Sequence, residues 1–197
     1  EAGIPHFEMT LELPIPFEPV GTVAAPLVRA EPAPEPADPP QLVTDGGERA
    51  CVEGLVECLA RPRRQLMLVS QQLDPLLFDR ADVVDAISRF ARDTRQARMQ
   101  ILIADSSLIV ARGHRLAELA RRLDSRIEIR RMPDDPAFRE RSFAVWDGTG
   151  WWLMPDFRDY QAMRNFHDPV AAARLGEEFQ RMWARSAPDP ELRVLKL

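Results

Sequence analysis

Two carboxylates in one short stretch have the side-chain chemistry that can hold a hydrolytic metal ion: Glu140 and Asp147 in "FRERSFAVWDGTGWWLMP". Alternating residues, a turn at Asp147-Gly148 and a second apolar run predict a β-hairpin over residues 141–154. The two carboxylates would then lie about 23 Å apart along one strand. A metal-dependent phosphodiesterase is therefore the least favoured alternative, and Asp147-Gly148 is interpreted as a turn signal.

Polar residues also follow two predicted strands. Ser70 and Gln71 end one strand, Asp105 ends the next, and His114 and Arg115 begin a helix soon afterwards. Open α/β sheets bind ligands at the carboxyl ends of their strands, so these side chains could line a cleft for an anion or small ligand. The favoured alternative is that they are ordinary loop and helix-capping groups.

Other chemical groups are sparse in this sequence. Cys51 and Cys58 would lie about 10 Å apart along one helix, too far for a disulfide, and we expect reduced thiols. The histidines are scattered, so no metal site is predicted. Lys196 is the only lysine, and no Ser-His-Asp order or phosphate-binding loop is present. No catalytic residue is therefore assigned.

Composition narrows the classes of function. The 197 residues carry a net charge of −5, and the pI is about 5.3, which argues against non-specific binding of nucleic acid. A local arginine patch remains compatible with these totals. No apolar run approaches the roughly 20 residues that span a bilayer, and no signal pattern opens the chain. We expect a cytoplasmic protein that does not bind membranes.

Helical and strand periodicities alternate after residue 46. The expected helices are 47–60, 82–94, 112–123 and 168–186, and the expected strands are 65–71, 99–105, 126–132, the hairpin 141–154 and a short closing strand at 192–197. Strands separated by helices imply right-handed crossovers. The prediction is an α/β fold with a mostly parallel mixed sheet flanked by helices on both faces, to which the hairpin adds antiparallel strands.

The first 46 residues differ from the rest. Residues 1–20 contain "EAGIPHFEMTLEL", an isolated strand pattern, and residues 21–46 form a Pro/Ala/Glu-rich linker. The strand resembles the last strand of GNAT-family N-acetyltransferases, which implies a truncated acetyltransferase domain at 1–20. The acetyl-CoA pyrophosphate loop of that family is not found in this chain. We therefore expect no cofactor here and acetyl-CoA only in a preceding domain.

Residues 47–197 resemble the phospholipase D superfamily in element order and in the final helix containing "EEFQRMWARS". That family's signature is histidine, any residue, lysine, four further residues and aspartate, in which the histidine is the nucleophile and the lysine binds phosphate oxygens. With Asp147 at the acidic position, Glu140 replaces the histidine and Ser142 replaces the lysine. The resemblance implies a degenerate site. A further resemblance is to an uncharacterised domain that follows a GNAT domain in some bacterial proteins.

The leading hypothesis is a non-catalytic accessory domain of a GNAT-type acetyltransferase that binds a ligand, a partner or a second copy of itself. The alternative is a nucleic-acid-binding module without hydrolase activity, which the low pI and missing lysine disfavour. Trp151 and Trp152 point to opposite faces of the hairpin, so one is expected at the surface. That exposed ring and the family's pairing habit predict a homodimer, unless the acetyltransferase domain covers the same patch.

Overall fold

The computed structural model describes residues 38–42, 47–133 and 140–194, which contain an eight-stranded sheet in the order β1-β7-β6-β5-β2-β3-β4-β8. The strands are β1 (Gln41–Leu42), β2 (Gln65–Ser70), β3 (Arg98–Ile103), β4 (Ile127–Arg131), β5 (Ser142–Trp146), β6 (Gly150–Met154), β7 (Met163–Asn165) and β8 (Ala187–Pro188). The strand predicted within 1–20 and most of the predicted linker lie outside the described residues.

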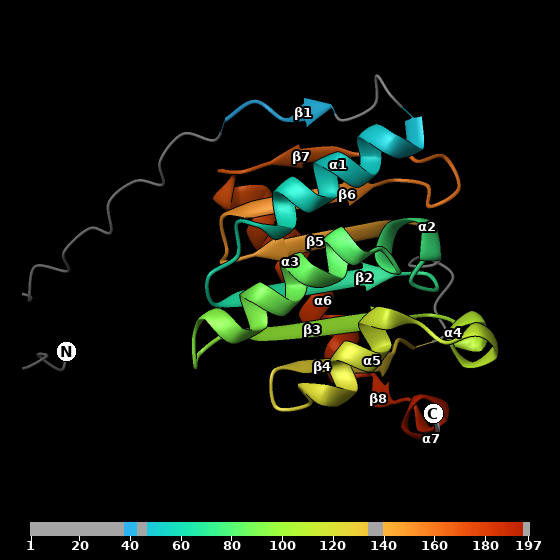
Figure 1. Ribbon diagram of the computed structural model, residues 1–197. Coiled ribbons are helices and arrows are strands. Elements are labelled where there is room, and N and C mark those ends of the chain that lie inside the picture. The colour runs from blue at the N-terminus through green and yellow to red at the C-terminus, as the bar shows by residue number, and fades with distance from the viewer. Residues whose placement is uncertain (1–37, 43–46, 134–139, 195–197) are drawn as a thin grey trace, which may run out of the picture. The chain divides into compact units, whose positions relative to one another are not determined.

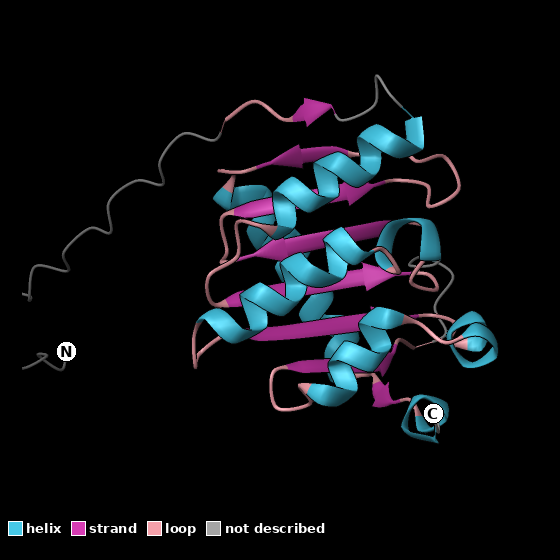
Figure 2. Cartoon of the chain, viewed as in Figure 1, coloured by secondary structure: helices cyan, strands magenta, loops and turns pink. Residues whose placement is uncertain are grey.

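Helices cover both faces of this sheet. They are α1 (Gly47–Leu59), α2 (Pro75–Phe78), α3 (Ala81–Asp93), α4 (Ser107–Arg112), α5 (Arg115–Arg122), α6 (Pro169–Ala184) and α7 (Pro190–Val194). In Figure 1, α1, α3 and α5 lie across one face and α6 lies behind the other. Figure 2 shows the same layering as cyan helices in front of and behind magenta strands. The predicted α/β class is thus confirmed.

Two hydrophobic cores follow from the alternation of side chains along the central strands. On β2, Leu66 and Leu68 belong to the core beneath α1, α3 and α5, whereas Met67 and Val69 belong to the core beneath α6. Both sets are almost fully buried. A strand that is covered on both faces buries successive side chains, which explains the continuous apolar run LMLV within "QLMLVS".

The parallel part of the sheet is smaller than the sequence predicts. Only β2, β3 and β4 are parallel to one another, and the other neighbouring pairs are antiparallel. The hairpin of β5 and β6 adds to β2 as expected. The chain then returns as β7, a short strand with no strong periodicity in its sequence, so the antiparallel part grows further.

The last described residues before α1 join the sheet instead of continuing as linker. Gln41 and Leu42 form β1, which pairs antiparallel with Arg164 and Met163 of β7. The Asp38 amide also donates to the His167 carbonyl at 3.0 Å. These are backbone contacts, so the side-chain pattern of a Pro-rich segment gives no sign of them.

The prediction of a closing strand at 192–197 is wrong for residues 192–194, because these residues belong to helix α7. The Asp189 carboxylate accepts a hydrogen bond from the Glu191 amide at 2.9 Å, and Pro190 opens the helix. An aspartate cap followed by proline starts a helix even when the next residues alternate. The sheet is completed on this side by β8, which pairs with β4.

Both hairpin tryptophans are buried, contrary to the expectation that one stays at the surface. Trp152 is fully buried in the core beneath α1, and Trp151 is 6% exposed in the core beneath α6. The Trp151 indole also donates to the Asp168 carboxylate, which caps α6, at 3.2 Å. Helices on both faces bury both rings, so this premise for a homodimer fails. None of the described helices has the length and apolar character needed to cross a bilayer.

Candidate functional site

Three residues, 147–149, connect the two strands of the hairpin, and the first two of them lie in the left-handed region. Asp147 has φ 51° and Gly148 has φ 69°, and the Thr149 amide donates to the Trp146 carbonyl at 3.1 Å. Two positive φ angles match the twist of the flanking strands and explain the Asp-Gly pair. The interpretation of Asp147-Gly148 as a turn is confirmed.

The Asp147 carboxylate has a second role that the local sequence does not indicate. It accepts hydrogen bonds from the backbone amides of Arg63 at 2.7 Å, Arg64 at 2.9 Å and Gln65 at 2.9 Å. These amides belong to the loop that leads into β2. Asp147 therefore ties the hairpin turn to that loop, across more than 80 residues of sequence.

The other degenerate positions lie at the far end of β5. Glu140 is exposed just before the strand, whereas Ser142 is 1% exposed within it. Because Val69 pairs with Phe143, the neighbouring Ser70 lies beside Ser142. The Ser142 side chain is thus inside the core, and Glu140 and Asp147 stand at opposite ends of the strand as expected. Among the described residues, no three His, Cys, Asp or Glu side chains are placed to share a metal ion.

Three residues of the predicted cleft come together at the carboxyl ends of β2 and β3. The Ser70 hydroxyl accepts from the Leu73 amide at 3.2 Å, and the Gln71 carbonyl accepts from the Asp105 amide at 2.9 Å. The Asp105 carboxylate accepts from the amide and hydroxyl of Ser107 at 2.9 and 3.0 Å, bonds that lower its pKa. Their polar groups serve local turns, and ligand binding here stays a prediction.

His114, also predicted to line the cleft, is 4% exposed and joins two loops. Its Nε2 donates to the Leu73 carbonyl at 3.0 Å, and its Nδ1 accepts from the Leu116 amide at 3.2 Å. This pairing requires the neutral imidazole. Burial lowers the pKa of His114, and the nearby Asp79 carboxylate partly opposes that shift. The Arg115 backbone amide donates to Asp79 at 2.7 Å.

Two non-glycine residues near this edge have left-handed backbone conformations, Leu73 with φ 51° and Tyr160 with φ 47°. The Tyr160 hydroxyl donates to the Asp74 carboxylate at 2.6 Å, and the same carboxylate caps α2 by accepting from the Leu76 amide at 2.9 Å. Burial and the bond to Asp74 raise the pKa of Tyr160. These contacts join the loop before α2 to the loop between β6 and β7.

The cysteines are buried, free thiols on α1. Burial raises the pKa of Cys51 to about 11 and that of Cys58 to about 12. The reactive thiolate is therefore scarce at neutral pH. The sequence-based expectation of reduced thiols without a catalytic role agrees with this environment.

The opposite edge, where the parallel strands begin, carries a feature that we did not predict from the sequence. Seven arginines gather in the loops before the strands and on the last turns of α3, and we call them the basic edge: Arg63, Arg64, Arg89, Arg92, Arg95, Arg98 and Arg126. The sequence contains arginines of this edge in "RPRR", "RQAR" and "SR", which stand before or at the start of β2, β3 and β4. Parallel strands begin at the same edge, so these segments meet.

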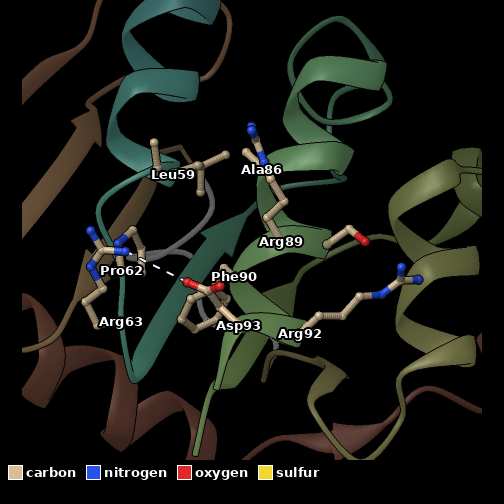
Figure 3. Close-up of a pocket in the computed structure, with 10 residues that line it drawn as sticks. Leu59, Pro62, Arg63, Ala86, Arg89, Phe90, Arg92 and Asp93 are labelled. Atoms are coloured by element: carbon tan, nitrogen blue, oxygen red, sulfur yellow. Dashed lines mark ion pairs between the residues drawn. The ribbon is translucent and has the colours of Figure 1, made fainter. Parts of the chain in front are cut away.

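A groove of about 500 Å³ opens beside the basic edge, between the end of α1 and the face of α3. Its lining includes Leu59, Pro62 and Phe90 together with three arginines of the basic edge. Figure 3 shows Arg63 beside Asp93, joined by the ion pair at 3.9 Å, while Arg92 extends away from that pair. The charged groups are therefore spread along the groove and do not converge on one point.

Comparison with solved structures identifies the type of fold. No curated protein matches this sequence. NucT from Helicobacter pylori is 13% identical with a TM-score of 0.56, and Nuc from Salmonella typhimurium, a phospholipase D family member, is 13% identical with a TM-score of 0.55. Each alignment covers 77% of this chain and 99% of the other. The fold is phospholipase D-like, as the element order predicts.

A third similar structure is TrmBL2, an archaeal chromatin protein whose structure shows a novel mode of DNA binding. It is 14% identical with a TM-score of 0.55; the alignment covers 77% of this chain, which spans 55% of TrmBL2. The family described as "Domain of unknown function (DUF7931)" matches residues 47–195. Because this match covers most of the chain, the protein belongs to the DUF7931 family.

Proposed function

We propose that residues 47–197 act as a non-catalytic phospholipase D-like domain that serves a GNAT-type acetyltransferase by binding a ligand, a partner or a second copy of itself. The proposal that the domain is non-catalytic rests on the environment of Ser142. This residue stands where the family has its phosphate-binding lysine, and it is 1% exposed. A substrate phosphate has no access to that position.

The chemistry of phosphoryl transfer supports the same conclusion. The family mechanism needs a nucleophile that takes the phosphoryl group and a cation that stabilises its oxygens. Glu140 places a carboxylate at the nucleophile position, where it would repel a phosphate anion. Asp147 has its carboxylate engaged with backbone amides at the other end of the strand.

A direct assay tests the absence of catalysis. The chain is incubated with bis(4-nitrophenyl) phosphate, with and without divalent metal ions, and we expect no turnover above buffer. The exposed Glu140 allows a control, because Glu140→Ala should leave the fold intact. Turnover by the wild-type chain that disappears in Glu140→Ala would contradict the proposal.

The acetyltransferase half of the proposal rests on "EAGIPHFEMTLEL" and on the Pro-rich linker that follows it. Acetyl-CoA would bind only to a preceding domain, so calorimetry of this chain with acetyl-CoA should give no signal. The sequence before Glu1 is the sharpest test. We expect a Gln/Arg-x-x-Gly-x-Gly/Ala loop there, whose backbone amides bind pyrophosphate at a helix N-terminus. A different sequence there would overturn the assignment.

Self-association is one form of the proposed role, supported by the pairing habit of phospholipase D-like domains that occur once per chain. Sedimentation of residues 47–197 at micromolar concentration tests it, with a homodimer as the expected result. A monomer both in this fragment and in the longer protein would exclude self-association and leave a ligand or another partner.

A second candidate function is nucleic-acid binding without hydrolysis. The basic edge favours it, because it concentrates exposed arginines in a protein whose net charge is −5. The similarity of fold to the DNA-binding protein TrmBL2 is compatible with such a role. Binding of a labelled oligonucleotide at low salt is the basic test of this candidate.

A further inference from the structure

We propose that the basic edge is a binding surface for the phosphate backbone of nucleic acid, at the opposite end of the strands from Glu140 and Ser142. This inference rests on the second candidate function and assigns it a location. The argument starts from charge. Among the described residues, the side chains of Arg64, Arg89, Arg92 and Arg95 contact no acidic partner.

The remaining arginines of this surface also keep their charge available. Arg98 donates to the carbonyls of Arg95 at 3.2 Å and Ala97 at 2.9 Å, and Arg126 donates to the Thr94 carbonyl at 2.8 Å. A neutral carbonyl orients a guanidinium without neutralising it. These bonds hold two of the arginines in place along the loops before β3 and β4.

Three acids lie at this edge, Asp93, Asp147 and the exposed Asp124, so the seven arginines keep an excess of four positive charges. Asp93 pairs with Arg63 at 3.9 Å, and both side chains are more than 60% exposed, so the pair is weak. The Asp147 carboxylate accepts hydrogen bonds from three backbone amides of this edge. It acts as a positioning residue, because these bonds fix the loop that carries Arg63 and Arg64.

The spacing favours an extended polyanion over a single phosphate. Neighbouring strands lie about 4.8 Å apart, so the starts of β2, β3 and β4 cover about 10 Å, and α3 extends the row beyond them. Figure 3 shows Arg63 and Arg92 directed away from each other, so they do not converge on one phosphate. A nucleic acid supplies a charge at every nucleotide, whereas acidic residues in a polypeptide are rarely consecutive.

The low pI of the chain does not count against this edge. Residues 1–46 hold eight acidic residues and one arginine, whereas residues 47–197 hold 23 acidic and 25 basic residues. The net charge of −5 therefore arises from the first 46 residues, and it does not exclude binding of a polyanion by residues 47–197.

The experiment compares two double variants with equal net charge. Arg92→Glu/Arg95→Glu reverses two charges of the basic edge, and Arg174→Glu/Arg181→Glu reverses two exposed arginines on α6, across the sheet. Binding of a fluorescein-labelled single strand of about 20 nucleotides is measured by anisotropy with the full chain. The series covers about 50 to about 200 mM NaCl, and circular dichroism checks that each variant is folded.

We expect the wild type to bind and the basic-edge variant to bind at least about tenfold more weakly. Its salt dependence should fall by about 1.4 in log–log slope, because each phosphate contact in a single strand contributes about 0.7. The α6 variant should keep the wild-type slope. Equal losses in the two variants would overturn the assigned surface while leaving nucleic-acid binding intact. No wild-type binding at low salt would overturn both.

A second probe separates nucleic acid from an acidic protein partner. A poly-glutamate peptide of matched length and charge is added as a competitor for the labelled strand. We expect it to compete far more weakly than unlabelled single-stranded DNA. Equal or stronger competition by the peptide would overturn the proposal in favour of an acidic polypeptide.

Discussion

At the carboxyl ends of β2 and β3 polar side chains bind backbone groups and each other, whereas at the amino ends arginines extend into solvent. Ser70 and Asp105 each accept within a local turn, and His114 donates to the Leu73 carbonyl of another loop. Arg92 and Arg95 on the opposite edge make no such bonds among the described residues. The two edges belong to the same strands, so the difference arises from the loops.

This contrast qualifies the rule that open α/β sheets bind ligands at the carboxyl ends of their strands. The rule identifies where loops from several strands meet, but the polar groups there can already form the hydrogen bonds that hold those loops together. In this chain the carboxyl edge is closed by buried Ser142 and His114. The amino edge retains unneutralised charge. Four sets of variants test this difference between the two edges.

Ser142→Lys is expected to have the largest effect, a loss of at least about 3 kcal/mol in unfolding free energy. It would place an ammonium at the position that we align with the family's lysine, where it would be buried without a partner. Ser142→Ala is the matched control and should cost less than about 1 kcal/mol. Urea denaturation of both variants tests this. A lysine variant of near wild-type stability would mean that the carboxyl edge is open.

Asp147→Ala is expected to cost about 2 kcal/mol, because three amides lose their acceptor and alanine tolerates positive φ poorly. Asp147→Asn keeps one side-chain oxygen and a residue type that accepts the left-handed region, so its cost should be about half as large. Equilibrium denaturation gives both values. Equal costs would show that the carboxylate charge, which both variants lose, is what stabilises the turn.

His114 should make stability depend on pH. Burial lowers its pKa in the folded state, so below the unfolded value of about 6.5 the unfolded chain binds a proton that the folded chain does not. This contribution is therefore complete above that pH and is lost as the pH falls through it. Thermal denaturation between pH 8 and 5 should show a decline that is shallower in His114→Gln. The same slope in both proteins would exclude His114 as its source.

Arg92→Ala/Arg95→Ala should have the smallest effect on stability, within about 0.5 kcal/mol of wild type. Both side chains are exposed, and folding does not depend on them if the basic edge serves binding. Chemical denaturation of this variant is the measurement. A loss above about 1 kcal/mol would make the amino edge structural, like the carboxyl edge, and would remove the contrast between them.

The sequence by itself determined the features that depend on neighbours in the chain. The Asp147-Gly148 turn, the stripe of Val83, Ile87 and Phe90 on α3, and the order of the main helices and of strands β2 to β6 follow from local patterns. The α/β class could be predicted for the same reason, whereas the alignment of Glu140 and Ser142 with the family's histidine and lysine stays a prediction.

Only the tertiary structure decided what depends on residues far apart in sequence. The amide partners of Asp147 lie more than 80 residues away, and the burial of both Trp151 and Trp152 depends on α6 covering the second face. The pairing of β1 with β7 is made by backbone groups that carry no side-chain signal. The basic edge likewise exists because parallel pairing brings the starts of three strands together, which spreads arginines from three separate segments along one surface.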